Sequence, residues 1–93
     1  MIELVSRPRL AGKARLRFDA RSGKQMLLYP ERGLELTESA ARVVALCGEG
    51  RTVAAIIDAL VTASGEPHAR IEAEVLTLLR ALDERGLLVV DAA

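Results

Sequence analysis

The stretch MLLYPERGLELTESAARVV, residues 26–44, determines the fold, because it changes from strand to helix within a short segment. Two apolar runs, residues 26–29 and 34–36, flank the sequence PERG at residues 30–33. Proline and glycine favour a tight chain reversal between two strands. Thr37 then supplies the side-chain hydroxyl that helix N-termini prefer. The stretch therefore predicts a strand, a turn, a short second strand and the start of a helix.

An additional strand is predicted upstream, where RLRF at residues 15–18 alternates with a period of two. The alternation places Leu16 and Phe18 on one face of the strand and the two arginines on the other. The sequence DARSGK at residues 19–24 has the composition of a turn. It is expected to reverse the chain into the strand around residues 25–29.

The last strand of this unit is short, with Leu34 and Leu36 expected to face inward and Glu35 outward. The three strands together predict an antiparallel meander. The last strand is short, and we expect it to have a free edge with unpaired backbone N–H and C=O groups.

The rest of the chain is predicted to form three helices, which gives an α+β, winged-helix-like fold of one domain spanning residues 1–93. The helices are expected to begin at Thr37, Thr52 and Pro67, and to end near Gly48, Gly65 and Gly86. Residues 1–12 have no steady period and are expected to form a loose or extended arm. Residues 87–90 are expected to form a short extended tail.

The third predicted helix carries more apolar residues than one buried stripe needs. At roughly 100° per residue, four of them share a narrow arc that we expect to face the core: Ile71, Val75, Leu78 and Leu82. Leu76 and Leu79 extend the apolar surface sideways. One flank of this helix is therefore either additional packing surface or the wall of a binding groove.

Composition excludes several locations for the protein. No apolar run approaches the roughly 20 residues that span a membrane, and the N-terminal sequence has no secretory signal pattern. Cys47 is the single cysteine of the chain and suits a reducing compartment. We therefore expect a cytoplasmic protein without a membrane partner.

The zero net charge conceals an asymmetry between the two parts of the chain. Residues 1–33 hold 8 basic and 3 acidic groups, 8 − 3 = +5, and residues 34–93 hold 5 basic and 10 acidic groups, 5 − 10 = −5. Such a division either steers a charged peptide or protein partner or is ordinary solvated surface.

Catalytic and cofactor chemistry lacks candidate residues. His68 is the only histidine and Cys47 the only cysteine, so a multi-ligand metal site or a Cys–His pair is not expected. We expect His68 on the surface and Cys47 as a small core residue. The segment 48–50, GEG, lacks the length and the lysine of a phosphate-binding loop. The sequence predicts no enzyme, no metal and no cofactor.

Two non-enzymatic functions remain, DNA reading by a winged helix and capture of an extended peptide. The helix that would enter a DNA groove, residues 52–63, carries Asp58 and no basic residue. Because groove readers need cations against phosphate, nucleic-acid binding is disfavoured. A peptide can instead add as a strand to a free sheet edge and place alternate side chains in an adjacent groove.

The sequence resembles the PqqD family of pyrroloquinoline quinone (PQQ) biosynthesis over about residues 8–90. The resemblance is carried by Pro8, Leu10, Leu27-Leu28, Pro30-Glu31-Arg32, Leu36, Ala40, Leu46-Cys47, Glu74-Val75 and Leu78-Leu79. The chain departs from the family pattern in two places. Gly48-Glu49 stands where Asp-Gly is usual, and Glu74 stands where Asp is usual.

The resemblance implies a peptide chaperone that holds the precursor peptide PqqA and presents it to PqqE. PqqE is a radical S-adenosylmethionine enzyme that joins a glutamate and a tyrosine side chain. The implied peptide lies along the third strand and against the third helix. In this chain the implied contacts are Leu34, Glu35, Leu36, Leu76, Leu79, Arg80 and Asp83.

Two alternatives to this function remain open from the sequence. The same module can serve another modified-peptide pathway, or the chain can be a winged-helix regulator. Exchange of strands between two copies near residues 30–33 would give a homodimer.

Overall fold

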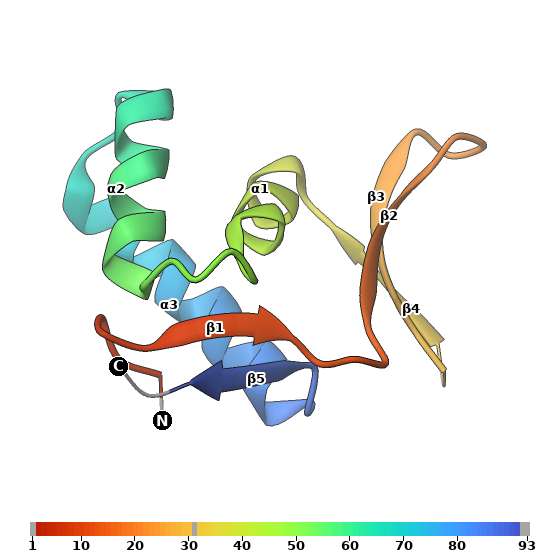
Figure 1. Ribbon diagram of the computed structural model, residues 1–93. Helices are drawn as coiled ribbons and strands as arrows, with labels where there is room; N and C mark the ends of the chain where they lie inside the picture. Colours follow the sequence, from red (N-terminus) through yellow and green to blue (C-terminus); the bar gives the residue numbers. More distant parts are fainter. Residues whose placement is uncertain (1, 31, 92–93) are drawn as a thin grey trace.

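A computed structural model of the 93-residue chain describes residues 2–30 and 32–91. Its elements, in chain order, are β1 (Arg7–Leu10), β2 (Arg15–Asp19), β3 (Lys24–Tyr29), β4 (Arg32–Leu36), α1 (Glu38–Leu46), α2 (Val53–Ser64), α3 (His68–Glu84) and β5 (Leu88–Asp91). Figure 1 shows the helices and the β1–β5 pair grouped together, with the sheet of β2, β3 and β4 beside them. The prediction of an α+β fold with a three-stranded sheet before three helices is confirmed.

The three-stranded sheet has the order β2-β3-β4 and is antiparallel throughout. Leu16, Leu27 and Leu34 lie opposite one another in one row, and Leu27 is completely buried. Directly paired residues lie on the same face of a sheet. The three leucines of this row therefore form the inner face, which packs against the core.

Phe18 is 56% exposed, unlike the leucines of the inner row. It pairs with Gln25 near the β2–β3 turn, which Figure 1 shows projecting away from the helices. The predicted alternation holds, because Phe18 lies on the Leu16 face, but no element among the described residues covers that end of the strand.

The N-terminal segment is partly extended, as one of the two predicted alternatives had it, but it is not a loose arm. β1 pairs with β5 in antiparallel register, from Arg7 opposite Asp91 to Leu10 opposite Leu88. Ile2 is buried, and the carbonyls of Leu4 and Ser6 accept hydrogen bonds from the backbone N–H groups of Ala54 and Val53. The first N–H groups of a helix have no hydrogen-bond acceptor within the helix. The N-terminal segment supplies acceptors for the first two N–H groups of α2. The predicted C-terminal tail is the other strand of this pair.

The helix ends follow the predicted signals. The Thr37 hydroxyl accepts a hydrogen bond from the N–H of Ala40, and the Thr52 hydroxyl accepts one from Ala55, each at 3.1 Å. Gly65 caps α2 with a φ of 71°, a left-handed conformation that glycine adopts without steric cost.

The buried face of α3 differs from the predicted arc. The buried residues are Ile71, Val75, Leu79 and Leu82, so Leu79 takes the core position expected for Leu78. Both leucines adjoin the same arc on opposite sides. Packing of α3 against α1, α2 and β5 decides that the Leu79 side is covered.

Candidate functional site

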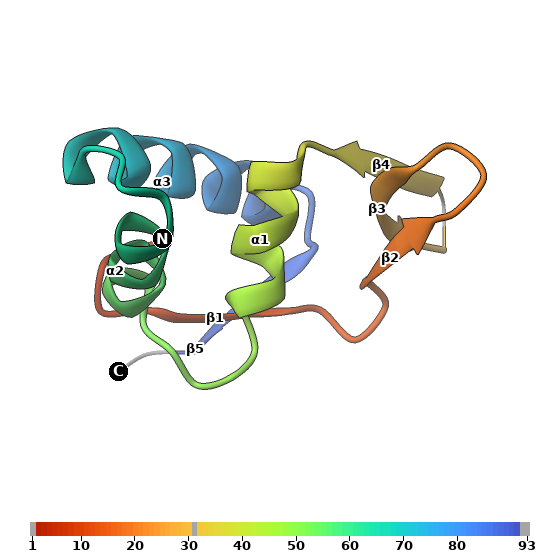
Figure 2. The same cartoon turned by 90° about the horizontal axis from the view of Figure 1, so that it is seen from above.

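A groove of about 840 Å³ lies between α1, α2 and α3. Figure 2 shows α3 running beside both other helices. The apolar lining includes Ala40 and Val43 of α1, Leu60 of α2, and Leu78 and Ala81 of α3. Because apolar area dominates this lining while its edges are charged, the groove suits side chains of a bound peptide.

The groove begins where β4 ends. Thr37 directly follows β4 and also lines the groove. β4 is an edge strand of its sheet, and Figure 2 shows it on the same side of the molecule as α3. A chain that paired with β4 would therefore reach the groove as it left the strand.

The register of the β3–β4 hairpin predicts which backbone groups of β4 are accessible. Tyr29 and Arg32 pair across a two-residue connection, and such a closing pair is hydrogen-bonded in tight hairpins. Hydrogen-bonded and non-bonded pairs then alternate along the strands. Gly33 and Glu35 therefore direct their N–H and C=O groups away from β3, toward the free edge.

The three predicted contact residues of β4 differ in exposure. Leu36 is buried and Leu34 packs against the core, so these two side chains are structural. Glu35 is exposed, and its carboxylate lies 3.1 Å from Lys24 Nζ. Recognition at this strand would consequently use the backbone rather than the leucine side chains.

The predicted contact residues of α3 do not line the groove. Leu79 is completely buried, which contradicts its assignment to an accessible flank. Leu76 is half-buried against the core, Asp83 is half-buried and Arg80 is exposed. The groove lies on the opposite flank of α3, where its lining includes Glu74, Thr77, Leu78 and Ala81.

Sequence analysis did not identify this flank because small residues form much of it. Ala73, Thr77 and Ala81 recur every four residues on α3 and all line the groove. That spacing places small side chains on one face, which permits close approach of another chain. A search for small-residue spacing would have found this flank.

Charged side chains at the edge of the groove are held in solvent-exposed pairs. The Arg70 guanidinium lies 3.5 Å from Glu66 and 3.4 Å from Glu74, both one helical turn away. Exposed pairs of this kind contribute little to stability. Arg70 can therefore exchange a partner for a carboxylate of a bound peptide at small cost.

The described residues offer no catalytic or metal-binding arrangement. Burial raises the pKa of the Cys47 thiol to about 11, which leaves it protonated and a poor nucleophile at neutral pH. His68 is exposed and lies 3.7 Å from Asp58. Within residues 2–30 and 32–91, no three His, Cys, Asp or Glu residues are grouped as metal ligands. No helix in this part combines the length and apolar content needed to cross a membrane.

Comparison with known proteins agrees with the fold and with the absence of catalytic groups. Residues 24–88 match the family model of coenzyme PQQ synthesis protein D (PqqD). The chain belongs to the PqqD family. This confirms the resemblance drawn from the PERG turn and its flanking leucines.

Two related proteins match this chain over most of its length. A PqqA binding protein of Rhodopseudomonas palustris strain TIE-1 is 41% identical over 84 residues, 90% of this chain and 82% of that protein. The bifunctional coenzyme PQQ synthesis protein C/D of Methylorubrum extorquens is 37% identical over 81 residues, 87% of this chain and 22% of that protein.

A solved PqqD structure shows the same fold. The solution NMR structure of the PqqD truncation of Methylobacterium extorquens PqqCD has a TM-score of 0.77 and 36% identity, covering 88% of this chain and 87% of that chain. That protein is described as a functional, stand-alone recognition element for ribosomally synthesized and post-translationally modified peptides. Membership of a family of recognition proteins confirms the prediction that this chain is not an enzyme.

Proposed function

We propose that this protein is a peptide chaperone of PQQ biosynthesis that binds the precursor peptide PqqA and presents it to the radical S-adenosylmethionine enzyme PqqE. The observation that carries the proposal is the free edge of β4, which leads directly into the groove between the helices. Named PqqA binding proteins about 40% identical to this chain support the choice of peptide.

The peptide would add to β4 as a fourth strand of the sheet. Its backbone would pair with the outward groups of Gly33 and Glu35, which gives affinity with little dependence on sequence. Specificity would come from side chains that enter the groove beyond Thr37. Leu60 and Leu78 offer apolar contacts there, and Arg70 offers a cation at the edge.

The opposite flank of α3 is the alternative wall for the peptide. Leu76, Arg80 and Asp83 are accessible there to different degrees, whereas Leu79 is excluded by its burial. We favour the groove flank because it is continuous with the end of β4 through Thr37.

Titration of the ¹⁵N-labelled protein with synthetic PqqA tests both the ligand and the location. We expect the amide signals of Gly33, Glu35, Thr77, Leu78 and Ala81 to shift most. Larger shifts at Leu76, Arg80 and Asp83 would move the site to the other flank. A precursor peptide from an unrelated pathway is the specificity control, and equal affinity for it would contradict the assignment to PQQ biosynthesis.

Two further parts of the proposal concern location and assembly. We expect the protein to act in the cytoplasm, where PqqA is synthesised and where a single free cysteine remains reduced. Exchange of strands between two copies stays a prediction. Sedimentation at several protein concentrations would show a dimer if exchange occurs, and monomer alone would contradict it.

A further inference from the structure

The three-stranded sheet has a second face that no described element covers. The register places Arg15, Leu28 and Gly33 in one row and Arg17, Met26 and Glu35 in the next. These rows alternate with the Leu16–Leu27–Leu34 row that packs on the core, so they point the other way. We call these six residues the outer sheet face.

An apolar patch occupies the centre of the outer sheet face. A Cβ atom on Gly33 would lie 3.0 Å from Leu28 Cδ2 and 3.1 Å from Met26 Cε. The side chains of Leu28 and Met26 on β3 therefore cover the backbone of Gly33 on β4, where glycine has no side chain of its own. Both are only half-buried.

Positive charge lies along the β2 side of this patch. Arg15 and Arg17 are exposed, and neither forms an ion pair with a carboxylate in the described part of the chain. Glu35 does not offset them, because its carboxylate already pairs with Lys24. The next row on this side of the sheet, Asp19 and Lys24, adds one charge of each sign. The face thus presents the guanidinium groups of Arg15 and Arg17, neither held in an ion pair within the described residues, beside an apolar centre.

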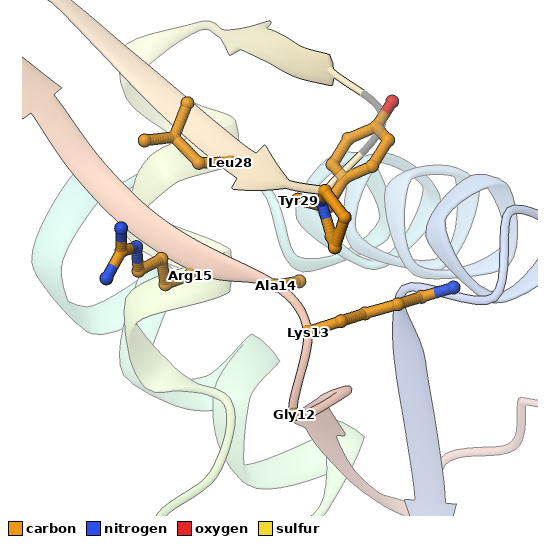
Figure 3. A pocket seen from close by; sticks show the side chains of 7 residues that line it. Gly12, Lys13, Ala14, Arg15, Leu28 and Tyr29 are labelled. Carbon is orange, nitrogen blue, oxygen red and sulfur yellow. The ribbon is translucent and has the colours of Figure 1, made fainter.

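A hollow of about 480 Å³ adjoins the same face at the start of β2. Lys13, Arg15, Leu28 and Tyr29 are among its lining residues. Figure 3 shows Arg15 and Leu28 on one side of the two strands, and Lys13 and Tyr29 on the other. The Lys13 ammonium points away from Arg15, toward Gly86 at the end of α3, so Arg15 is the cation of the hollow on the side of the outer sheet face.

We propose that the outer sheet face docks a protein partner whose surface presents Asp or Glu side chains around a small apolar patch. The identity of the partner rests on the function proposed above: it is the enzyme that receives the peptide. A peptide added to β4 would extend the same sheet, so alternate peptide side chains would stand on the outer sheet face. The chaperone would then present those side chains on the surface that the enzyme contacts.

Two other occupants fit the observations less well. Single-stranded nucleic acid needs aromatic platforms for its bases, but Phe18 belongs to the opposite face of the sheet. A second copy would bring together two faces that carry the same excess of positive charge, and such like-charge contact is unfavourable.

The test uses Arg15→Glu/Arg17→Glu in the full chain, with Arg9→Glu/Arg85→Glu as a control of equal charge change. Arg9 and Arg85 are exposed and lie outside the three-stranded sheet. Arg9 lies in β1 and forms a solvent-exposed pair with Asp91, and such pairs contribute little to stability. Two affinities are measured for each variant. Surface plasmon resonance gives the affinity for PqqE, and calorimetry gives the affinity for synthetic PqqA. We expect the outer-face variant to lose about tenfold or more in PqqE affinity, with a reduced salt dependence. Its PqqA affinity should equal that of the wild type and of the control.

Each other outcome has a defined meaning. Equal PqqE affinity in both variants overturns the docking surface. Wild-type protein that binds PqqA but not PqqE overturns this inference and leaves the peptide assignment intact, whereas failure to bind PqqA overturns the proposed function itself. Self-association in sedimentation, or a shift of single-stranded DNA, that the outer-face variant abolishes would assign the face to another occupant.

Discussion

Leu78 and Leu79 are consecutive residues of α3 that serve different surfaces: Leu78 lines the groove, whereas Leu79 is completely buried in the core. Neighbouring side chains on a helix diverge by roughly 100°. One residue step on α3 therefore separates the proposed binding surface from the structural one.

This separation predicts different effects of a charge at each position. Leu79→Glu buries an unpaired carboxylate and should cost several kcal/mol, on the order of the whole stability of a small domain. Leu78→Glu places the charge in an open groove, so it should cost about 1–2 kcal/mol of stability and weaken PqqA binding about tenfold or more. Urea unfolding and peptide titration measure the two effects. Unfolding of both variants to the same extent would contradict the assignment of Leu78 to the groove.

The free edge of β4 predicts a contrast between two substitutions at Glu35. Glu35→Pro removes the outward N–H and should weaken peptide binding strongly, since proline cannot donate to an added strand. Glu35→Ala keeps that donor and removes only the exposed pair with Lys24, so its PqqA affinity should stay close to that of the wild type. Calorimetry on both variants, with circular dichroism to confirm the fold, decides between them. A proline variant that binds normally would exclude strand addition at this position.

The β1–β5 pair predicts that the N-terminal residues are needed for folding. A chain lacking residues 1–10 would lose β1, the buried Ile2 side chain and the carbonyls that accept from α2. We expect several kcal/mol of destabilisation, because this removes core area and leaves helix N–H groups unpaired. Thermal unfolding measures the change. Val5→Ser is the control, because Val5 is exposed and its replacement should leave the midpoint nearly unchanged.

Cys47 predicts a loss of stability in alkaline solution. Burial raises the pKa of the Cys47 thiol from 9.0 to about 11. The folded state therefore holds a proton that the unfolded state releases above pH 9. The free energy of unfolding should be unaffected by this thiol below pH 9 and should fall between pH 9 and pH 11, by about 2 kcal/mol for this partly accessible group.

Cys47→Ala isolates this effect from other groups that titrate in the same range. The difference in unfolding free energy between the wild type and Cys47→Ala should shrink as the pH rises from 9 to 11. A difference that stays constant over this interval would show that the thiol ionises equally in both states.

The sequence by itself determined the two strands, the turn between them and the start of the first helix in residues 26–44. These features depend on local physics: Leu34 and Leu36 alternate with Glu35, and the Thr37 hydroxyl accepts from a backbone N–H three residues away. Family membership was also predictable, because the PERG turn and the leucines around it lie close together in the chain. Such short-range relationships need no knowledge of what packs against them.

Only the tertiary structure decided which surfaces are covered. The pairing of β1 with β5 joins residues more than 70 positions apart. The four residues RPRL of β1 alternate between exposed and covered positions, but so short an alternation does not show which strand they pair with. The periodicity of α3 placed Leu78 and Leu79 on the two sides of one apolar arc, but it could not show which side α1, α2 and β5 would cover. Because the Leu79 side of α3 is buried in the core, the Leu78 side remains accessible and lines the groove.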